Sequence, residues 1–366
     1  MYDILTITFT ENVGHPMITL FSTFTCIYCC YYEQSGGHMI KIFTCVILFL
    51  TFQQSNVVSA KIVKANKPYT YEMLEDDLAK IQKKYPGKVK IKSIGTTHFD
   101  RDIWAIKLGK GKKNVVLIGS HHGREWLTSL MLMKMLESYA ASYNEKGLFG
   151  FKSHHILNDV SLWFVPMLNP DGVAVQQHEL QRFSPKHQEL LVKMNGGSTN
   201  FEGWKSNGLG VDLNRQYPAG WESLNGNPAA PSNKFYKGEK PLEAKEVRSL
   251  TRFIKEINPS IAVAYHTAGR EIFWNYKNGN YLKRDKRIAK KISKLTGYKL
   301  AEPEKDAVGG GFTDWFITTY HRPALTIEIS YLVGETNPPL SIFTKEWKRN
   351  RYVGLKLAAE AKKVPD

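Results

Sequence analysis

Val115-Val116-Leu117-Ile118-Gly119-Ser120-His121-His122-Gly123-Arg124-Glu125-Trp126 joins a short apolar run to two histidines and a glutamate. The apolar run is typical of a buried strand, and apolar residues return at helical spacing over residues 127–143. His122 and Glu125 therefore lie where a strand ends and a helix begins. An imidazole and a carboxylate at such a corner can turn onto one metal ion, and zinc binds ligands of this kind. Because His-x-x-Glu pairs also arise by chance, this assignment depends on the motifs that follow.

Strand and helix patterns alternate along the rest of the chain. This alternation predicts one α/β domain of three layers, with a mixed, mostly parallel twisted sheet and helices on both faces. Helical patterns cover residues 69–85, 241–257, 281–296, 314–319 and 343–363, and strand patterns cover 89–94, 103–108, 161–167, 260–265 and 324–328.

Three chemically reactive residues, His122, His266 and Glu328, fall at or just past the ends of predicted strands. In open α/β sheets ligands bind outside the carboxyl ends of the strands, so we expect these three side chains to converge. Residues 195–240 are rich in Gly, Asn, Pro and Ser, and a loop of that length in a compact domain is usually functional.

The first sixty residues differ from the rest. Residues 39–60 have a lysine, a short apolar run and small residues before Lys61, which predicts a secretory signal peptide cleaved after Ala60. We interpret residues 1–38 as a mis-assigned upstream extension, with Met39 as the true start; the alternative is a second membrane-associated segment. The catalytic domain would then be residues 61–366.

Cysteine and charge indicate an exported protein. All four cysteines precede residue 46, so residues 61–366 must be held by their core alone, which a chain of about 300 residues can achieve. The formal net charge is +16, and residues 1–60 contribute one Lys against three acidic residues. An anionic wall polymer is therefore an expected partner, whereas nucleic acid is not. Basic residues occur at 110–113, 283–294 and 345–351, which predicts no single binding stripe. We expect a secreted or wall-associated monomer with no membrane span after cleavage.

Six motifs in order resemble the zinc metallocarboxypeptidases. The resemblance covers nearly all of residues 69–360, and within the family the chain looks most like the bacterial gamma-D-glutamyl-L-diamino acid peptidases, which cut peptidoglycan stem peptides. That finer placement depends on residues 204–221 and on the absence of a prodomain. The motifs are Gly119 to Trp126, Asn169-Pro170-Asp171-Gly172, Val211-Asp212-Leu213-Asn214-Arg215, Tyr265-His266-Thr267, Gly310-Gly311-Phe312-Thr313-Asp314-Trp315 and Thr326-Ile327-Glu328.

The resemblance implies one zinc ion per chain, held by His122, Glu125 and His266. Asp212 would accept the other ring N–H of His122 and fix its tautomer. Glu328 would be the general base, taking a proton from the attacking water and delivering it to the leaving nitrogen. A carboxylate at the end of an apolar strand is costly unless it is used or paired.

The resemblance also assigns residues to the substrate. Arg124 would polarise the scissile carbonyl or bind a nearby carboxylate. Asn214 and Arg215 would grip a terminal carboxylate, which a guanidinium binds in a bidentate manner. Arg182 is the nearest counterpart of a further family arginine, so we interpret it as an oxyanion stabiliser. His121 would pack behind the site.

One position departs from the family. The family's substrate-capping tyrosine falls at Asp306, and no Tyr lies between Tyr298 and Tyr320. Either a gap hides the match, or an acid at Asp306, Glu302 or Glu304 meets the amino group of a diamino acid.

These observations predict a secreted zinc peptidase that cleaves peptide bonds next to a free carboxylate, with the gamma-D-glutamyl-diamino acid bond of wall peptides as the expected substrate. The alternatives are a general metallocarboxypeptidase that releases amino acids from protein C-termini, or a non-catalytic wall-binding relative. A binder needs neither Glu328 nor the arginines. Thr313, at the expected pocket floor, leaves the side-chain preference open.

Overall fold

The computed structural model describes residues 3–12, 19–35, 38–47, 61–143, 153–302 and 308–365. The chain divides into two compact units, Met1–Ala60 and Lys61–Asp366. The first unit contains an antiparallel sheet in the order β1-β2-β3, formed by β1 (Asp3–Asn12), β2 (Thr19–Ser35) and β3 (His38–Ile47). The predicted extension and signal peptide fall in this unit and stay predictions; residues 48–60, with the expected cleavage site, lie outside the described residues.

The second unit is built on an eight-stranded sheet in the order β10-β9-β11-β8-β6-β7-β5-β4. Neighbours pair in parallel at β10/β9, β11/β8, β8/β6 and β6/β7, and antiparallel at β9/β11, β7/β5 and β5/β4. The predicted mixed, mostly parallel sheet is therefore confirmed. The strands are β4 (Val89–Thr96), β5 (Asp102–Leu108), β6 (Lys113–Ile118), β7 (Val160–Val165), β8 (Ile261–Thr267), β9 (Glu271–Phe273), β10 (Lys299–Leu300) and β11 (Ala324–Ile329).

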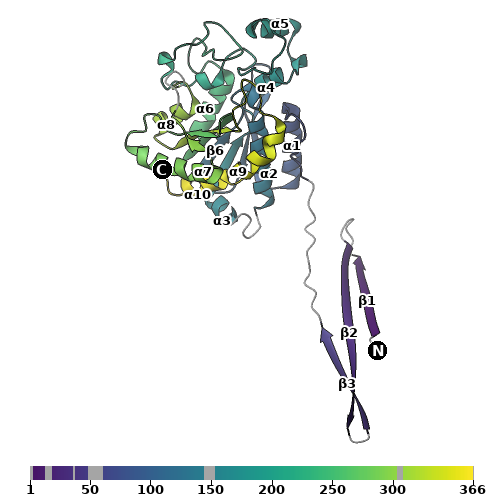
Figure 1. Cartoon of the computed structure of the whole chain (residues 1–366). Coiled ribbons are helices and arrows are strands. Elements are labelled where there is room, and N and C mark those ends of the chain that lie inside the picture. The colour runs from purple at the N-terminus through teal and green to yellow at the C-terminus, as the bar shows by residue number, and fades with distance from the viewer. Residues whose placement is uncertain are drawn as a thin grey trace. The chain divides into compact units, whose positions relative to one another are not determined.

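Helices cover both faces of this sheet (Figure 1). The first of them begins at Thr70, whose side chain accepts the N–H of Met73 and so satisfies one free donor of the first turn. The helices are α1 (Tyr71–Lys84), α2 (Leu127–Ala141), α3 (Ser153–Asp159), α4 (Pro170–Gln176), α5 (Pro185–Met194), α6 (Lys245–Ile257), α7 (Leu282–Thr296), α8 (Phe312–Tyr320), α9 (Phe343–Asn350) and α10 (Val353–Ala361).

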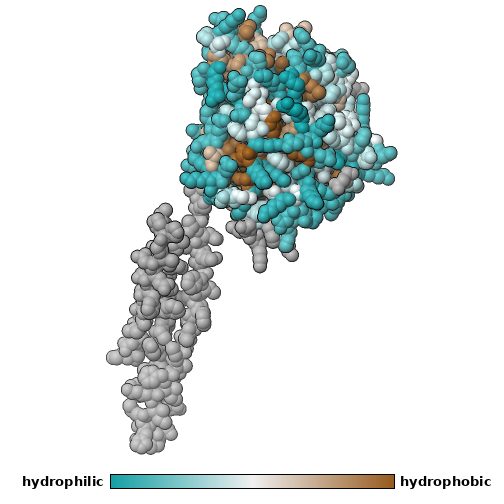
Figure 2. All heavy atoms as spheres, turned by 180° about the vertical axis from the view of Figure 1, so that it is seen from behind, coloured by the Kyte–Doolittle hydropathy of each residue, from teal (hydrophilic) through white to brown (hydrophobic). Residues whose placement is uncertain are grey.

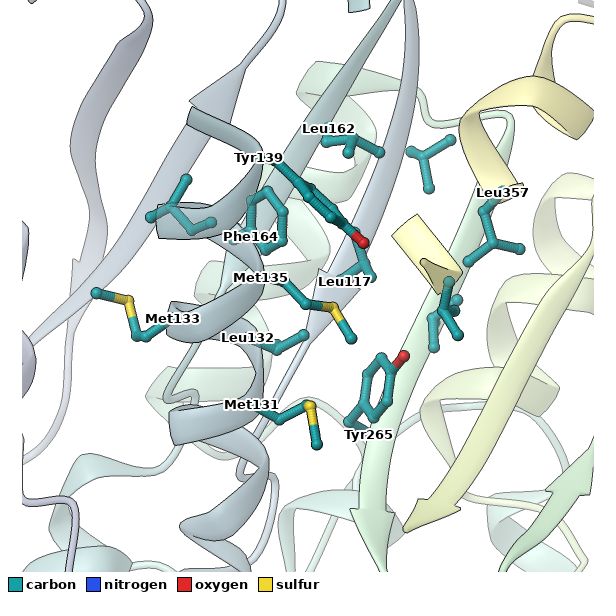
Figure 3. Close-up of a cluster of buried hydrophobic side chains, with 14 of the residues drawn as sticks. Leu117, Met131, Leu132, Met133, Met135, Tyr139, Leu162, Phe164, Tyr265 and Leu357 are labelled. Carbon is teal, nitrogen blue, oxygen red and sulfur yellow. The ribbon is translucent and has the colours of Figure 1, made fainter. Parts of the chain in front are cut away.

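The central strand β6 shows why both faces must be covered. Its side chains alternate between two cores because successive residues of a strand point to opposite faces. Val115 and Leu117 belong to the core under α2 and α10, whereas Val116 and Ile118 belong to the core under α6 and α8. Figure 3 shows the first core, in which Leu132, Met135 and Tyr139 of α2 point toward side chains of β6, β7, β8 and α10.

Two local predictions were wrong. The predicted helix 343–363 is two helices, α9 and α10, because the hydroxyl of Tyr139 donates to the carbonyl of Arg351 at 2.8 Å and its ring packs against Gly354, where a Cβ would come within 2.8 Å. The stretch from Leu168 to Gly172, whose sequence predicts a turn, instead contains the start of the short helix α4, which Pro170 begins and Asn169 caps.

The face of the molecule in Figure 2 is mostly hydrophilic, with smaller hydrophobic areas between the polar side chains. Within the described ranges, no helix combines the length and the apolar character needed to cross a membrane.

Candidate metal and peptidase site

The corner between β6 and α2 is held in place by the Asn169–Gly172 turn. The Asn169 amide donates to the carbonyl of His121 at 3.0 Å and to that of Ser206 at 3.1 Å, so one side chain joins two loops. Gly123 passes so close to Gly172 that a Cβ would lie 2.3 Å from its carbonyl oxygen. Only glycine fits here, and the close approach fixes the chain on either side of His122.

His122, Glu125 and His266 converge on one point. Nδ1 of His122 lies 2.7 Å from Oε1 of Glu125, and Nδ1 of His266 lies 2.8 Å from Oε2 of the same carboxylate. One potential ligand atom from each residue lies within 4.8 Å of the others, and all three residues are buried. The convergence arises because His122 follows β6 and His266 ends β8, its parallel neighbour.

Glu125 and His266 shift each other's pKa within this cluster. Burial alone would raise the pKa of Glu125, but the imidazoles of His122 and His266 hold it well below its usual range. Burial lowers the pKa of His266, but the Glu125 carboxylate outweighs this and raises it. A carboxylate that stays ionised between two imidazoles is a strong ligand set for a divalent cation.

Asp212 lies behind His122. Its Oδ1 is 3.2 Å from Nε2 of His122, on the side of the ring away from Glu125, and the carboxylate is fully buried. Burial raises the pKa of Asp212, but Lys205, His122 and Arg215 outweigh it and leave the pKa well below its usual range. An ionised Asp212 accepts a hydrogen bond from the Nε2–H group of His122, which leaves Nδ1 of the same ring free to bind a metal.

Glu328 occupies the next strand. It pairs in register with His266 across β11 and β8 and with Glu271 across β11 and β9. Burial raises the pKa of Glu328 to about 7, and its Oε2 is a buried oxygen that no described residue contacts by a hydrogen bond. A carboxyl group with this pKa exchanges a proton readily near neutral pH.

These side chains open into a cavity of about 580 Å³. Its lining is strongly polar and contains both signs of charge. The cations are Arg124, Lys205 and Arg215, and the acids beyond the metal cluster and Asp212 are Glu271, Glu302, Asp314 and Glu328. The cavity therefore suits a substrate that carries carboxylate and amino groups.

Most residues predicted from the sequence line this cavity. Arg124 donates to the carbonyl of Gly203 at 3.3 Å, which directs its guanidinium along the rim. Asn214 accepts the N–H of Phe312 through its Oδ1 at 3.0 Å. Arg215 donates to Asn227 at 3.1 Å and lies over the ring of Phe235. His121 is fully buried, and its Nε2 lies 3.1 Å from the hydroxyl of Tyr217.

Two sequence predictions have a different outcome. Arg182 does not line the cavity: it lies on the surface, 4.0 Å from Glu72 of α1, because the η3 turn Leu180–Arg182 directs it outward. The structure therefore does not bring it to the site as an oxyanion stabiliser. Asp306 lies outside the described residues, as does Glu304, whereas Glu302 lines the cavity.

Lys205 and Glu271 are charged cavity residues that sequence reasoning missed, and Lys205 lies close to the predicted site residue Asp212. Its Nζ lies 3.4 Å from Oδ2 of Asp212 and 4.7 Å from the Phe235 ring centroid, and it exerts an electrostatic effect on both Glu328 and His266. The backbone holds it firmly, since its N–H donates to Asn233 and its carbonyl accepts from Gly123. The sequence feature that could have indicated Lys205 is its position after Trp204, in the long loop rich in Gly and Asn.

The donor set fits zinc. Two imidazole nitrogens and a carboxylate are ligands of catalytic zinc sites, which keep a further position open for water. Here both Nδ1 atoms face a single carboxylate, and Asp212 orients one of the rings from behind. One potential ligand atom from each of the three side chains is thus close enough to the others to share one ion.

Comparisons with known proteins agree with this geometry. The zinc carboxypeptidase family (Peptidase_M14) matches residues 74–352. The chain is 34% identical over 290 residues to "Gamma-D-glutamyl-L-diamino acid endopeptidase 1" of Lysinibacillus sphaericus, covering 77% of this chain and 70% of that protein. It is 32% identical over 309 residues to "Uncharacterized protein YqgT" of Bacillus subtilis, covering 83% and 81%.

Solved structures show the same fold. Bovine thrombin-activatable fibrinolysis inhibitor, in complex with a tick carboxypeptidase inhibitor, superposes with a TM-score of 0.66 at 16% identity, over 82% of this chain and 99% of that one. The predicted resemblance is confirmed, and the cofactor is zinc. By its motifs, its fold and its cluster of metal ligands, this chain belongs to the zinc carboxypeptidase family and is a zinc metallopeptidase.

Proposed function

We propose that this protein is exported and hydrolyses the gamma-D-glutamyl-diamino acid bond of bacterial wall peptides. One observation carries the proposal: the three metal ligands, the buried Glu328 and the cations Arg124, Lys205 and Arg215 line one polar cavity. The similarity to the gamma-D-glutamyl-L-diamino acid endopeptidase of Lysinibacillus sphaericus supports the bond specificity. The cluster supports hydrolysis, and the polarity of the cavity supports a charged substrate.

Zinc, held by His122, Glu125 and His266, supplies Lewis-acid activation of water and of the scissile carbonyl. Glu328 receives the proton of the attacking water on its unpaired Oε2 and returns it to the leaving nitrogen. Its pKa of about 7 suits both transfers, because the carboxylate is basic enough to accept and its acid strong enough to donate. Asp212 keeps His122 in one tautomer throughout.

The cations bind the acidic parts of the substrate. Arg215 and Asn214 lie together on the η4 turn (Leu213–Arg215) and would hold a substrate carboxylate. Lys205, whose charge lowers the pKa of Glu328, would stabilise the negative charge that develops on the carbonyl oxygen. Arg124 would orient the peptide at the rim.

The acidic wall of the cavity would select the second amino group of a diamino acid. Glu271 lies on β9 beside Glu328, and Glu302 accepts from the amide of Asn275 at 2.6 Å. The apolar residues that line the cavity are Phe273, Trp274 and Ala301, and most of its other lining residues are polar or charged. Asp306 remains a proposed contributor from outside the described residues.

Product analysis tests the reaction. The zinc-loaded protein is incubated with purified muropeptides and with ordinary peptides of equal length, with and without a chelator. We expect release of diamino acid products from muropeptides alone, loss with the chelator and recovery with added zinc. Release of C-terminal residues from ordinary peptides instead would support a general carboxypeptidase.

A paired substitution tests the general base. Glu328→Gln keeps the size of the side chain but cannot accept a proton, so we expect kcat to fall about 10²- to 10⁴-fold while zinc content stays at one ion per chain. Glu189→Gln on the exposed face of α5 is the matched control and should retain full activity. Full activity of Glu328→Gln would contradict the mechanism.

Cell fractionation tests export. We expect the protein outside the cell, beginning at Lys61, and no peptides from residues 1–38. Intact protein retained in the cell, or peptides from residues 1–38, would contradict the proposed processing.

A further inference from the structure

One face of α7 carries a continuous row of cations. Its residues are spaced three or four apart, so their side chains lie above one another on the helix. The row runs for about 16 Å, given 1.5 Å per residue. Its six members line one shallow surface groove: Lys283, Lys286, Arg287, Lys290, Lys291 and Lys294. The row was not apparent along the chain, where basic residues are interrupted by other residues, but the helical period gathers them on one face.

The rest of α7 explains why this face is so uniform. The apolar side chains Ile288, Ala289 and Ile292 are completely buried against the domain. The one acid of the helix, Asp285, is also buried and is paired with Arg284 at 2.8 Å and with Asn278 at 2.7 Å. No acidic side chain of α7 is therefore left to offset the exposed cations.

Only part of the row is neutralised from outside the helix. Glu360 of α10 pairs with Arg287 at 2.6 Å and with Lys291 at 2.7 Å. Within the described part of the chain, the other four lysines form no ion pair. Three of them, Lys286, Lys290 and Lys294, follow one another at four-residue spacing, where like charges destabilise a helix by a few tenths of a kcal/mol per pair. An anion bound along the row would remove this repulsion.

We propose that this face of α7 binds a linear polyanion with regularly spaced phosphate groups, such as a phosphodiester-linked wall polymer. The four uncompensated lysines recur about every 4.5 to 6 Å along the axis, which suits a chain of repeated charges. The protein would encounter such a polymer only if it is exported, so this point rests on the proposed function. The binding itself depends only on the charges of α7.

The same observations disfavour two other polyanionic partners. A membrane-surface helix inserts an apolar face into the lipid, but the apolar face of α7 is buried in the domain, leaving only Tyr281 and Leu282 exposed at its start. Single-stranded nucleic acids bind with bases stacked on aromatic side chains, and the row from Lys283 to Lys294 contains none.

One member of the row lies near a residue of the catalytic cavity wall. The ammonium group of Lys286 lies 5.9 Å from the ring centroid of Trp274, and Trp274 lines the cavity that contains Glu328. A polymer held on α7 would therefore lie beside the wall of the active site. Binding there would hold the peptidase on the material that carries its proposed substrate.

Binding to long-chain inorganic polyphosphate, measured over a range of salt concentrations, tests this proposal. The test variant combines Lys283→Gln, Lys286→Gln, Lys290→Gln and Lys294→Gln. The control combines Lys90→Gln, Lys110→Gln, Lys186→Gln and Lys255→Gln, four exposed lysines on other elements that remove the same charge. Each lost contact should reduce the slope of log K against log salt by about 0.7, so the test variant should lose about 3 units of slope and the control far less.

Peptidase activity on a small soluble peptide should stay unchanged in both variants, and neither variant should unfold at a lower temperature than the wild type. Equal losses in the two variants, or no loss in either, would overturn the α7 site. Equally tight binding to anionic lipid vesicles or to single-stranded DNA would overturn the choice of polymer. Because polymer binding and hydrolysis are measured separately, an inactive protein that binds polyphosphate would reject only the proposed function.

Discussion

Oδ1 of Asp212 lies 3.2 Å from Nε2 of His122, while Nδ1 of the same ring lies 2.7 Å from Glu125. The two ring nitrogens thus have separate tasks, one toward a buried carboxylate and the other toward the metal site. Asp212 also accepts the N–H of Asn214 at 3.1 Å, so one carboxylate positions both a metal ligand and the turn that carries Arg215.

Replacing Asp212 tests this arrangement. Asp212→Asn removes the charge that orients His122, so we expect zinc affinity to fall about 10- to 100-fold. Chelator competition measures the affinity, and Asp76→Asn on the exposed side of α1 provides the control. An unchanged zinc affinity in a folded Asp212→Asn protein would show that His122 needs no such partner.

Replacing Lys205 tests electrostatic stabilisation of the reaction. Lys205→Gln removes the cation beside Asp212 and near Glu328, so we expect kcat to fall about 10²- to 10³-fold with little change in KM. Lys205→Arg keeps the charge and should recover much of the rate. A loss confined to KM would assign Lys205 to substrate binding instead.

The two arginines of the sequence analysis should behave differently. Arg215 lines the cavity, so Arg215→Gln should lower kcat/KM about 10- to 100-fold through weaker binding of a substrate carboxylate. Arg182 lies on the surface near Glu72, and Arg182→Gln should leave both kinetic constants unchanged. Kinetics on the same peptide compare the two variants directly. A rate loss in Arg182→Gln would show that this residue contributes to the active site.

Glu246 makes stability depend on pH. Burial, reinforced by Asp171, raises the pKa of Glu246 from 4.5 to about 7. Between these values the native state keeps a proton that the unfolded chain has already lost, so stability decreases as pH rises through this window. The expected decrease is about 3 kcal/mol, with a plateau above pH of about 7.

Urea unfolding of the wild type and of Glu246→Gln at several pH values measures this dependence. The glutamine keeps an acceptor for the Asn207 amide, which lies 3.1 Å from Oε1, but has no proton to lose. The variant should therefore lack this part of the pH dependence. Parallel curves for the two proteins would show that Glu246 does not hold its proton in the native state.

Local sequence was sufficient for several of the central elements of the fold. The apolar run before Gly119 predicted β6, and the helical spacing after Trp126 predicted α2. The alternation of strand patterns with helix patterns along the chain predicted a sheet covered on both faces. The sequence failed where side chains from elsewhere intervene. Tyr139 interrupts the last helical pattern at Arg351, more than two hundred residues away, and no local rule contains that contact.

The sequence by itself determined which residues hold the reactive groups: His122 and Glu125 share a corner, and His266 and Glu328 end strands. Tertiary structure alone decided that β6, β8 and β11 are neighbours, which brings Glu125 and His266 to 2.8 Å across 141 positions. It also placed Lys205 inside the cavity and Arg182 outside it. The reason is physical, since the path of a long loop is set by contacts such as Asn169 with Ser206, which residue type and spacing do not encode.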